Sequence, residues 1–465
     1  MDKVINEKIN ERVLSKSEKA KKLMPILLFL FVLTNLMVQT FVTVSPIVAE
    51  HFFISASTVS IIVTITTITL GVCSVIYGAL SDFISIKKIL ITGIIMLVSG
   101  SLLGFIFQDS FIMIVISRAI QTAGQGSISA MYLVIASRYL EGITKIKYFA
   151  YFTACFQLAQ ALGVVVGGKL TEYVSWQGLL LIPLISIISL PIIIKYTPES
   201  DIKEKKKIDF VGLIIFSIFI IFITLYLNSE NIKILLCTIC SLIIFIIYIS
   251  KNDNAFITPK FFKENKKYMR ALSIVWIVYF AQFSFSFLYT FIIKDGYNES
   301  LGMVSLILLP GYIAATIIGG VGDKIINKIG SYNTIFIGIV SIIISLLGTV
   351  FFIDKGTLVL SILGILYFVG FNTIYSPLIN AVTGALPEKE MGRGIGLNDL
   401  SINVTGSIGV AITGKIVSMT SLPAAIVISK NTNFVTYQYA ALLLALFSIA
   451  SIIVLIRNRK KLFNQ

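Results

Sequence analysis

The chain has 465 residues, of which 56% are hydrophobic and only 13% are charged, and its mean hydropathy is +0.93. Soluble chains carry about 25% charged residues, so this composition excludes a soluble enzyme, a secreted disulfide scaffold and a disordered tail protein. The formal net charge of +15 would suggest nucleic acid in a soluble domain. Here the charges lie between apolar runs, and no nucleic-acid partner is expected.

Apolar runs of about 20 residues, the length that a helix needs to cross a membrane, recur from end to end. They follow a polar segment over 1–22 and predict an all-α, polytopic membrane protein with fourteen transmembrane helices and no cleaved signal peptide. The predicted spans are 23–46, 56–78, 89–107, 111–137, 148–168, 177–195, 209–228, 232–250, 271–293, 301–321, 333–353, 357–379, 395–416 and 436–456.

The basic residues test this count, because Lys and Arg between spans favour the cytoplasmic side. With the N-terminus inside and alternating loops, 31 of the 38 basic residues fall inside, 6 fall outside, and Arg118 lies within a span. This split predicts a multi-pass protein of the cell membrane with both termini cytoplasmic.

The chain also repeats itself. Gly78-Ala-Leu-Ser-Asp82, followed by Lys87, is similar to Gly319-Gly-Val-Gly-Asp323. The offset of eight helices predicts two six-helix bundles with an inserted helix pair. The predicted segments are a cytoplasmic N-terminal segment over 1–22, a bundle over 23–195, the inserted pair with its basic loops over 196–270, a bundle over 271–456 and a cytoplasmic tail over 457–465.

The segment from Gly78 to Lys87 resembles the loop signature of the major facilitator superfamily between helices 2 and 3, although the family's glycine after the acid is absent. A small residue at 78 would let helices approach, and Asp82 would cap a neighbouring helix and form a contact that breaks as the halves rock. Asp82, Lys87 and Asp323 are therefore expected to act in gating. The alternative is a solvated turn with ordinary inside lysines.

Arg118 lies several residues inside the fourth span, in Ile116-Ser-Arg118-Ala-Ile-Gln121. A charge there is costly, so the side chain should face the bundle interior or water and have a function, unless it snorkels to the interface. It resembles the arginine of the family's fourth-helix motif, which is associated with proton transfer and gating.

Gly163 and Gly167 lie four residues apart on the fifth span and allow a close helix crossing. The run Ala161-Leu-Gly163-Val-Val-Val-Gly167-Gly168 resembles the antiporter motif of proton-coupled drug exporters, with Val164 in place of the motif's proline. Both glycines are assigned to gating. Generic close packing would produce the same pattern.

Asp399 is the carboxylate placed well inside a predicted span, and it is the candidate for proton coupling together with Arg118. Burial would bring its protonation towards the physiological range, which an antiporter requires. In the alternative, the span starts later and Asp399 lies near the cytoplasmic surface.

Polar side chains inside otherwise apolar spans predict a central substrate site, although each one would also serve as an interhelical hydrogen bond. They suit an amphipathic, weakly charged molecule. These residues are Asn35, Gln39, Gln157, Gln160, Tyr279, Gln282, Asn372, Tyr375 and Asn398.

Together with Leu309-Pro-Gly-Tyr312 and Tyr375-Ser-Pro377-Leu-Ile-Asn380, these features resemble the fourteen-helix drug:proton antiporters of the major facilitator superfamily, and are most similar to Gram-positive tetracycline exporters. The resemblance implies export of tetracycline, free or as a metal chelate, or of related amphipathic drugs. It also implies alternating access driven by the proton gradient, with no cofactor. Relatives carry a span-13 glutamate where this chain has Thr405.

Two other classes of function compete with this interpretation. One is a transporter of the same superfamily for another substrate, such as an importer or a lipid flippase. The other is a membrane enzyme, which would need clustered acids, histidines or a nucleophile, whereas His51 is isolated and the acids are scattered. The expected partners are the drug, protons and the lipid bilayer, with the chain acting as a monomer. No metal site is expected from the cysteines.

Overall fold

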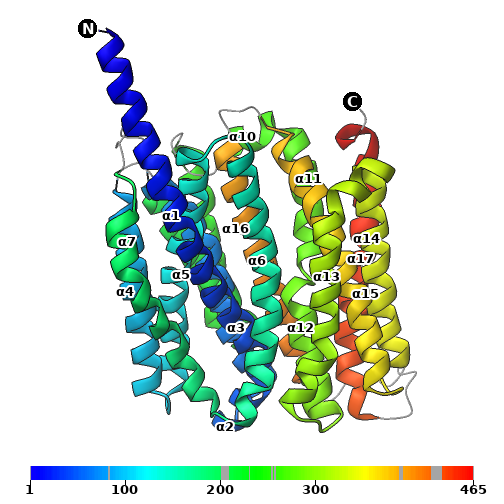
Figure 1. The fold of residues 1–465 in the computed structure, drawn as a ribbon. Helices are drawn as coiled ribbons and strands as arrows, with labels where there is room; N and C mark the ends of the chain where they lie inside the picture. The colour runs from blue at the N-terminus through cyan, green and yellow to red at the C-terminus, as the bar shows by residue number, and fades with distance from the viewer. Residues whose placement is uncertain are drawn as a thin grey trace.

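In the computed structural model, the described residues are 2–81, 84–199, 209–229, 231–252, 255, 258–386, 391–419 and 432–463. They form long helices that stand side by side (Figure 1), and no strand occurs within these ranges. A helix satisfies its own backbone hydrogen bonds, which a segment crossing hydrocarbon must do. The predicted all-α class is confirmed.

The N-terminal part contains six of the predicted spans. The first helix continues backwards through the polar segment predicted over 1–22, and it is followed by a short helix with Pro46 in its first turn, where a missing N–H is tolerated. The elements are α1 (Asp2–Thr43), α2 (Ser45–Phe52), α3 (Ala56–Leu80), α4 (Ile86–Ile106), α5 (Phe111–Tyr139), α6 (Gly142–Gly168), η1 (Leu170–Glu172), η2 (Trp176–Ser189) and α7 (Leu190–Tyr196).

A pair of helices follows at the position predicted for the inserted pair. α8 (Phe210–Ser229) packs on α9 (Ile232–Lys251), and α8 also contacts α3 and α16. The pair therefore lies beside the line where the N-terminal and C-terminal parts meet.

The C-terminal part contains the remaining predicted spans. The ninth span is divided: α11 ends at Tyr279, α12 starts at Gln282, and α12 ends in a turn of π-helix. The elements are α10 (Pro259–Glu264), α11 (Lys266–Tyr279), α12 (Gln282–Phe291), η3 (Ile292–Gly296), α13 (Leu301–Ile329), α14 (Ser331–Phe352), α15 (Thr357–Thr383), α16 (Met391–Val417), η6 (Thr432–Phe434) and α17 (Val435–Leu462).

Twelve helices within the described residues are long and apolar enough to cross a membrane, so the predicted count of fourteen is not confirmed. The two predicted spans outside this set are 111–137 and 209–228. The first corresponds to α5, whose Arg118, Gln121 and Gln125 lower its hydropathy. The second corresponds to α8, an apolar helix of 20 residues over Phe210–Ser229, within which Val211–Ile223 is the described apolar stretch.

The helices pack as two groups. We call α1–α7 the N-terminal bundle and α11–α17 the C-terminal bundle. α1 packs on α6 and α4 on α5 in the first, and α14 packs on α15 and α17 in the second. The groups meet along two seams, α3 against α16 and α6 against α13. The domain boundaries expected from the sequence stay a prediction.

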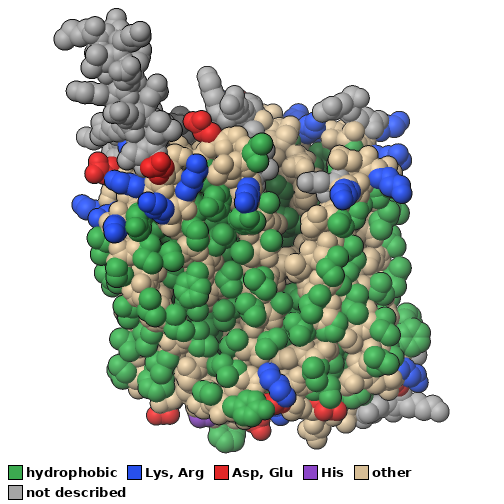
Figure 2. Space-filling model, viewed as in Figure 1, with side chains coloured by type: hydrophobic (Ala, Val, Ile, Leu, Met, Phe, Trp, Pro, Cys, Tyr) green, Lys and Arg blue, Asp and Glu red, His purple; other side chains and the backbone are tan. Residues whose placement is uncertain are grey.

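One end of the molecule carries most of the exposed Lys and Arg side chains, and both chain termini lie there (Figures 1 and 2). We call this the basic end. Figure 2 shows a hollow near it, between α6 and α13 as placed in Figure 1. The first half of α6 is largely exposed, including Phe149 and Tyr151. The bundles are therefore separated at the basic end.

Gly78 corrects one expectation from the sequence. It was expected to permit close helix approach, but a Cβ at Gly78 would meet nothing within 4 Å, and the same holds for Gly320 and Gly322 in the repeated motif. All three lie towards the basic end, where the bundles are separated. In this state these three glycines face open space, whereas a Cβ on Gly319, the first glycine of the repeated motif, would approach the Asn372 amide at 2.6 Å.

At the opposite end the bundles touch, and we call this the closed end. The Ser418 hydroxyl accepts a hydrogen bond from the Ser57 backbone N–H at 2.7 Å. On the other seam, the Ser305 hydroxyl donates to the Val164 carbonyl at 2.7 Å. The structure is thus closed at one end and open at the other.

Candidate functional site

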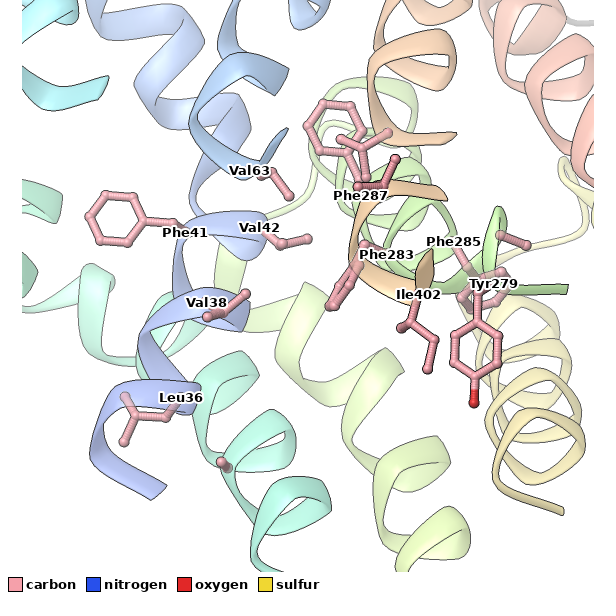
Figure 3. Packing of buried hydrophobic residues seen from close by; sticks show 14 of the residues in the cluster. Leu36, Val38, Phe41, Val42, Val63, Tyr279, Phe283, Phe285, Phe287 and Ile402 are labelled. Carbon is pink, nitrogen blue, oxygen red and sulfur yellow. The ribbon is translucent and has the colours of Figure 1, made fainter. Parts of the chain in front are cut away.

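An apolar layer separates the two bundles near the middle of the molecule. Figure 3 shows Val38 and Val42 of α1 and Val63 of α3 projecting towards Phe283 and Ile402 of the C-terminal bundle. All five are buried. Polar side chains predicted for the site lie on either side of this layer, so the candidate site consists of several polar clusters around it.

The Arg118 cluster lies inside the N-terminal bundle. The guanidinium donates to Gln121 Oε1 at 2.6 Å and to the Met37 carbonyl at 3.4 Å, and it stacks over the Phe41 ring at 4.2 Å from the centroid. Gln121 in turn donates to Ser101 Oγ at 3.0 Å. Arg118 therefore faces the interior, as predicted, and does not snorkel.

Arg118 is only 2% exposed, and its Nε has no hydrogen-bond partner. Among the described residues, its side-chain hydrogen bonds go to an amide and a carbonyl rather than to a carboxylate. Burying a charge without an opposite charge lowers stability. A residue that carries such a charge inside a membrane span is therefore expected to have a function. Arg118 is thus a cation held by dipoles and an aromatic face.

The close crossing predicted at the two glycines of α6 is present. A Cβ on Gly163 would approach the Leu36 carbonyl at 2.5 Å, and a Cβ on Gly167 would approach the Thr40 carbonyl at 2.8 Å. Gln39 lies at this crossing, with its Cβ beside Gly163. The Thr40 hydroxyl donates to the Gly163 carbonyl at 3.1 Å. Both glycines thus act in packing α1 on α6; their role in gating stays a prediction.

Asn35 and Gln157 each join another polar residue. Asn35 Oδ1 accepts from Gln125 at 3.1 Å inside the N-terminal bundle. Gln157 donates to Asn372 Oδ1 at 2.6 Å, which joins α6 to α15 across the two bundles. Asn372 also donates to the Ala315 carbonyl of α13. Gln160, one turn further along α6, is buried.

Asp399 lies two turns into α16, on the seam with α3. Its neighbours Leu397, Asn398 and Leu400 are buried, while Asp399 itself keeps partial exposure. The Ser74 side chain of α3 lies close to its carboxylate, and the Ser74 hydroxyl donates to the Gly71 carbonyl of its own helix at 2.8 Å. The acid and this neighbouring serine therefore belong to different bundles.

The remaining predicted residues lie in the C-terminal bundle. Tyr279 and Tyr375 are close enough to Asp399 to interact with its charge, and Tyr279 packs edge-on against Phe371 at 5.1 Å. Buried oxygens of Gln282 and Asn398 have no hydrogen-bond partner. These amides retain hydrogen-bonding capacity that a ligand or water would satisfy.

The predicted gating residues are less well defined. Asp82 lies outside the described residues, and Asp323 belongs to α13 but its side chain is not described. Lys87 is half-buried in the first turn of α4. Their proposed contacts stay predictions.

Sequence reasoning missed the polar residues that lie near the key charges. Gln121 and Gln125 lie three and seven residues after Arg118, on the same face of α5, and this spacing was a usable signal. Ser74 carried no such signal, because a serine in an apolar helix usually bonds its own backbone, as Ser74 also does with Gly71 at 2.8 Å. Within the described residues, no group of three metal-ligating side chains occurs.

Comparison with known proteins places this architecture among transporters. The model of the Major Facilitator Superfamily matches residues 27–410. The quinolone resistance protein NorB of Staphylococcus aureus (strain MSSA476) is 25% identical over 402 residues, which cover 83% of this chain and 86% of that protein.

The riboflavin transporter RibZ of Clostridioides difficile (strain 630) is 23% identical over 373 residues, which cover 79% of this chain and 81% of that protein. Among solved structures, the nucleoside transporter NupG has a TM-score of 0.63 at 14% identity, covering 94% of this chain and 99% of that one. At this identity the likeness to NupG concerns the fold alone.

Proposed function

Because the chain belongs to the Major Facilitator Superfamily, it is a membrane transporter and not an enzyme, and we propose that it exports amphipathic drugs from the cytoplasm in exchange for protons. The basic end would face the cytoplasm, since Lys and Arg favour that side. The open hollow at this end would admit the drug, and the closed end would open to release it.

The observation that carries the proposal is the position of Asp399. It is a partly exposed carboxylate two turns inside an apolar helix, and the side chain of Ser74, which lies close to it, belongs to the other bundle. Protonation would neutralise the acid and change this contact between the bundles. A proton taken up from one side and released to the other would therefore be tied to the rocking of the seam.

The substrate class follows from the side chains around the apolar layer. Amides and tyrosines with free hydrogen-bonding capacity suit a molecule with an aromatic body and several polar groups. Quinolones and riboflavin, named for the two relatives, are fused-ring heteroaromatic compounds, and tetracyclines are also fused-ring compounds. We propose tetracycline, free or as a metal chelate, or a related drug, carried by a monomer.

The test measures proton movement in energised inverted vesicles when tetracycline or a quinolone is added. The native protein is expected to dissipate the pH gradient on drug addition, and Asp399→Asn is expected to abolish this response. Asp109→Asn, a substitution of an exposed acid outside the helices, is the matched control. No proton movement with the native protein would contradict antiport, and retained coupling in Asp399→Asn would contradict the role of Asp399.

An alternative is transport of another fused-ring compound in the opposite direction. The similarity to RibZ supports this candidate. Uptake of labelled riboflavin into right-side-out vesicles, with no drug-dependent proton movement in inverted ones, would favour it. Lipid translocation by the same vesicles would favour a flippase.

A further inference from the structure

A second pocket lies at the basic end of the C-terminal bundle, away from both seams. Its volume is about 470 Å³, and it lies among the ends of α11, α13, α14, α15 and α17. The hollow between the bundles does not include it, and no residue predicted for transport lines it.

The pocket is lined by two cations. Lys267 belongs to the first turn of α11, and Arg459 belongs to the last turn of α17. The Arg459 guanidinium lies over the Tyr332 ring at 4.5 Å from its centroid, which restrains its position. Among the described residues that line the pocket, none is acidic, so the two positive charges are not balanced there.

The polar groups around the cations are hydrogen-bond donors. The first turn of α14, a helix of 22 residues, lies in the wall, and its N-cap, Gly330, has no side chain to bond the free N–H groups. The amides of Asn333 and Asn380 complete the wall, and the Asn333 amide already donates one hydrogen bond to the Ile329 carbonyl at 2.8 Å. Two cations and a helix N-terminus around one cavity match the needs of a phosphate group.

The surroundings favour a lipid as the source of that phosphate. The apolar face of the pocket contains Leu462 and Phe463, and Phe463 packs edge-on against Tyr332 at 5.9 Å, as aromatic residues do at a membrane interface. Further along α14 and α17, the side chains of Ile337 and Ile453 are exposed and would contact acyl chains. A soluble phosphate would gain nothing from these apolar surfaces.

We propose that this pocket binds the headgroup of an anionic phospholipid from the leaflet at the basic end, with Lys267 and Arg459 on its phosphate. Basic pockets between helices at this interface hold such headgroups, and each basic residue near the surface adds to the attraction. The bound lipid would join the ends of α11, α14 and α17. This site does not depend on the direction of transport or on the drug.

The experiment compares purified full-length protein in nanodiscs of phosphatidylcholine alone and with phosphatidylglycerol added. Native mass spectrometry counts the bound phosphatidylglycerol, and thermal unfolding measures stabilisation. Lys267→Gln with Arg459→Gln is expected to weaken phosphatidylglycerol binding by about tenfold or more. The matched control is Arg457→Gln with Lys460→Gln, which removes the same charge from exposed positions outside the pocket lining and is expected to weaken binding much less.

Each outcome decides the proposal. Equal loss in both double variants would show general attraction to a basic surface and would overturn the site. Stabilisation by inorganic phosphate in phosphatidylcholine nanodiscs, lost in the pocket variant, would overturn the lipid source. The unfolding temperature of each variant in phosphatidylcholine alone shows that it is folded, so a loss of binding reports on the pocket.

Discussion

At the scale of single residues, the notable feature is a buried arginine held without a carboxylate. Arg118 contacts Gln121, the Met37 carbonyl and the Phe41 ring, all of which are neutral. Neutral partners stabilise a cation less than a carboxylate would, so the guanidinium stays available to an approaching anionic group or proton pathway. A purely structural role would be served as well by a neutral side chain.

This argument predicts different effects of Arg118→Gln on transport and on stability. Replacing a buried charge by a neutral side chain is often neutral or stabilising, so the unfolding temperature in detergent is expected to stay the same or rise. Drug-dependent proton movement is expected to fall by at least about tenfold. Parallel loss of stability and transport would instead identify Arg118 as a structural residue.

Gly163 gives a second prediction at this scale. A Cβ there would lie 2.5 Å from the Leu36 carbonyl, whereas at Gly320 it would meet nothing within 4 Å. Gly163→Ala is therefore expected to destabilise the protein by about 1–3 kcal/mol through overpacking. Gly320→Ala is expected to be neutral or to stabilise by up to about 1 kcal/mol, because alanine favours helix. Unfolding in detergent measures both, and equal effects would contradict the close crossing.

At the scale of helices, the closed end is held by a carboxylate from one bundle on a helix N-terminus of the other. Glu172 of η1 accepts from the Ser300 hydroxyl at 3.0 Å, and its carboxylate lies against Gly302 at the start of α13. Lys169 pairs with the same carboxylate at 3.1 Å. Negative charge is favourable at a helix N-terminus, and this contact must break when the closed end opens.

Removing this contact is expected to shift the equilibrium towards opening at the closed end. Ser305→Cys, placed on the buried seam, reports opening through its rate of labelling by a membrane-impermeant maleimide. Adding Glu172→Ala is expected to raise that rate by about two- to fivefold, the effect of a weak exposed polar contact. Glu299→Gln is the nearby control. An unchanged rate in the Glu172 variant would mean that other contacts hold the end closed.

At the scale of the whole molecule, the two ends differ in the separation of the bundles. Ser57 and Ser418 touch at the closed end, while Gly78 and Gly320 face open space towards the basic end. Transport by alternating access requires this difference to reverse. Fixing either end in one state should therefore stop transport.

A disulfide tests this requirement. In a chain whose four cysteines are replaced by alanine, Ser57→Cys with Ser418→Cys is expected to crosslink on oxidation and to stop transport reversibly, with recovery on reduction. The single variants are the controls. Gly78→Cys with Gly320→Cys is expected to resist crosslinking in this state. Full transport by the oxidised Ser57–Ser418 pair would contradict rocking about the seams.

The sequence by itself determined the class of the molecule and much of its order along the chain. Hydropathy alone identified the helices, because every crossing segment must be apolar for about 20 residues. The pattern also predicted α5, although its Arg118 and two glutamines leave it outside the twelve helices that qualify by length and hydropathy. The same rule identified Arg118 and Asp399, since charges in such segments are costly.

Only the tertiary structure decided which of these residues meet. Asp399 lies close to Ser74, 325 positions earlier in the chain, and Gln157 of α6 meets Asn372 of α15 across the two bundles. No periodicity encodes such pairs, because a helix pattern specifies which face is polar but not which helix lies opposite. The tertiary structure also decided which end is open and which is closed. Opening and closing change the contacts between the bundles, while the helices keep the same sequence and local hydrogen bonds.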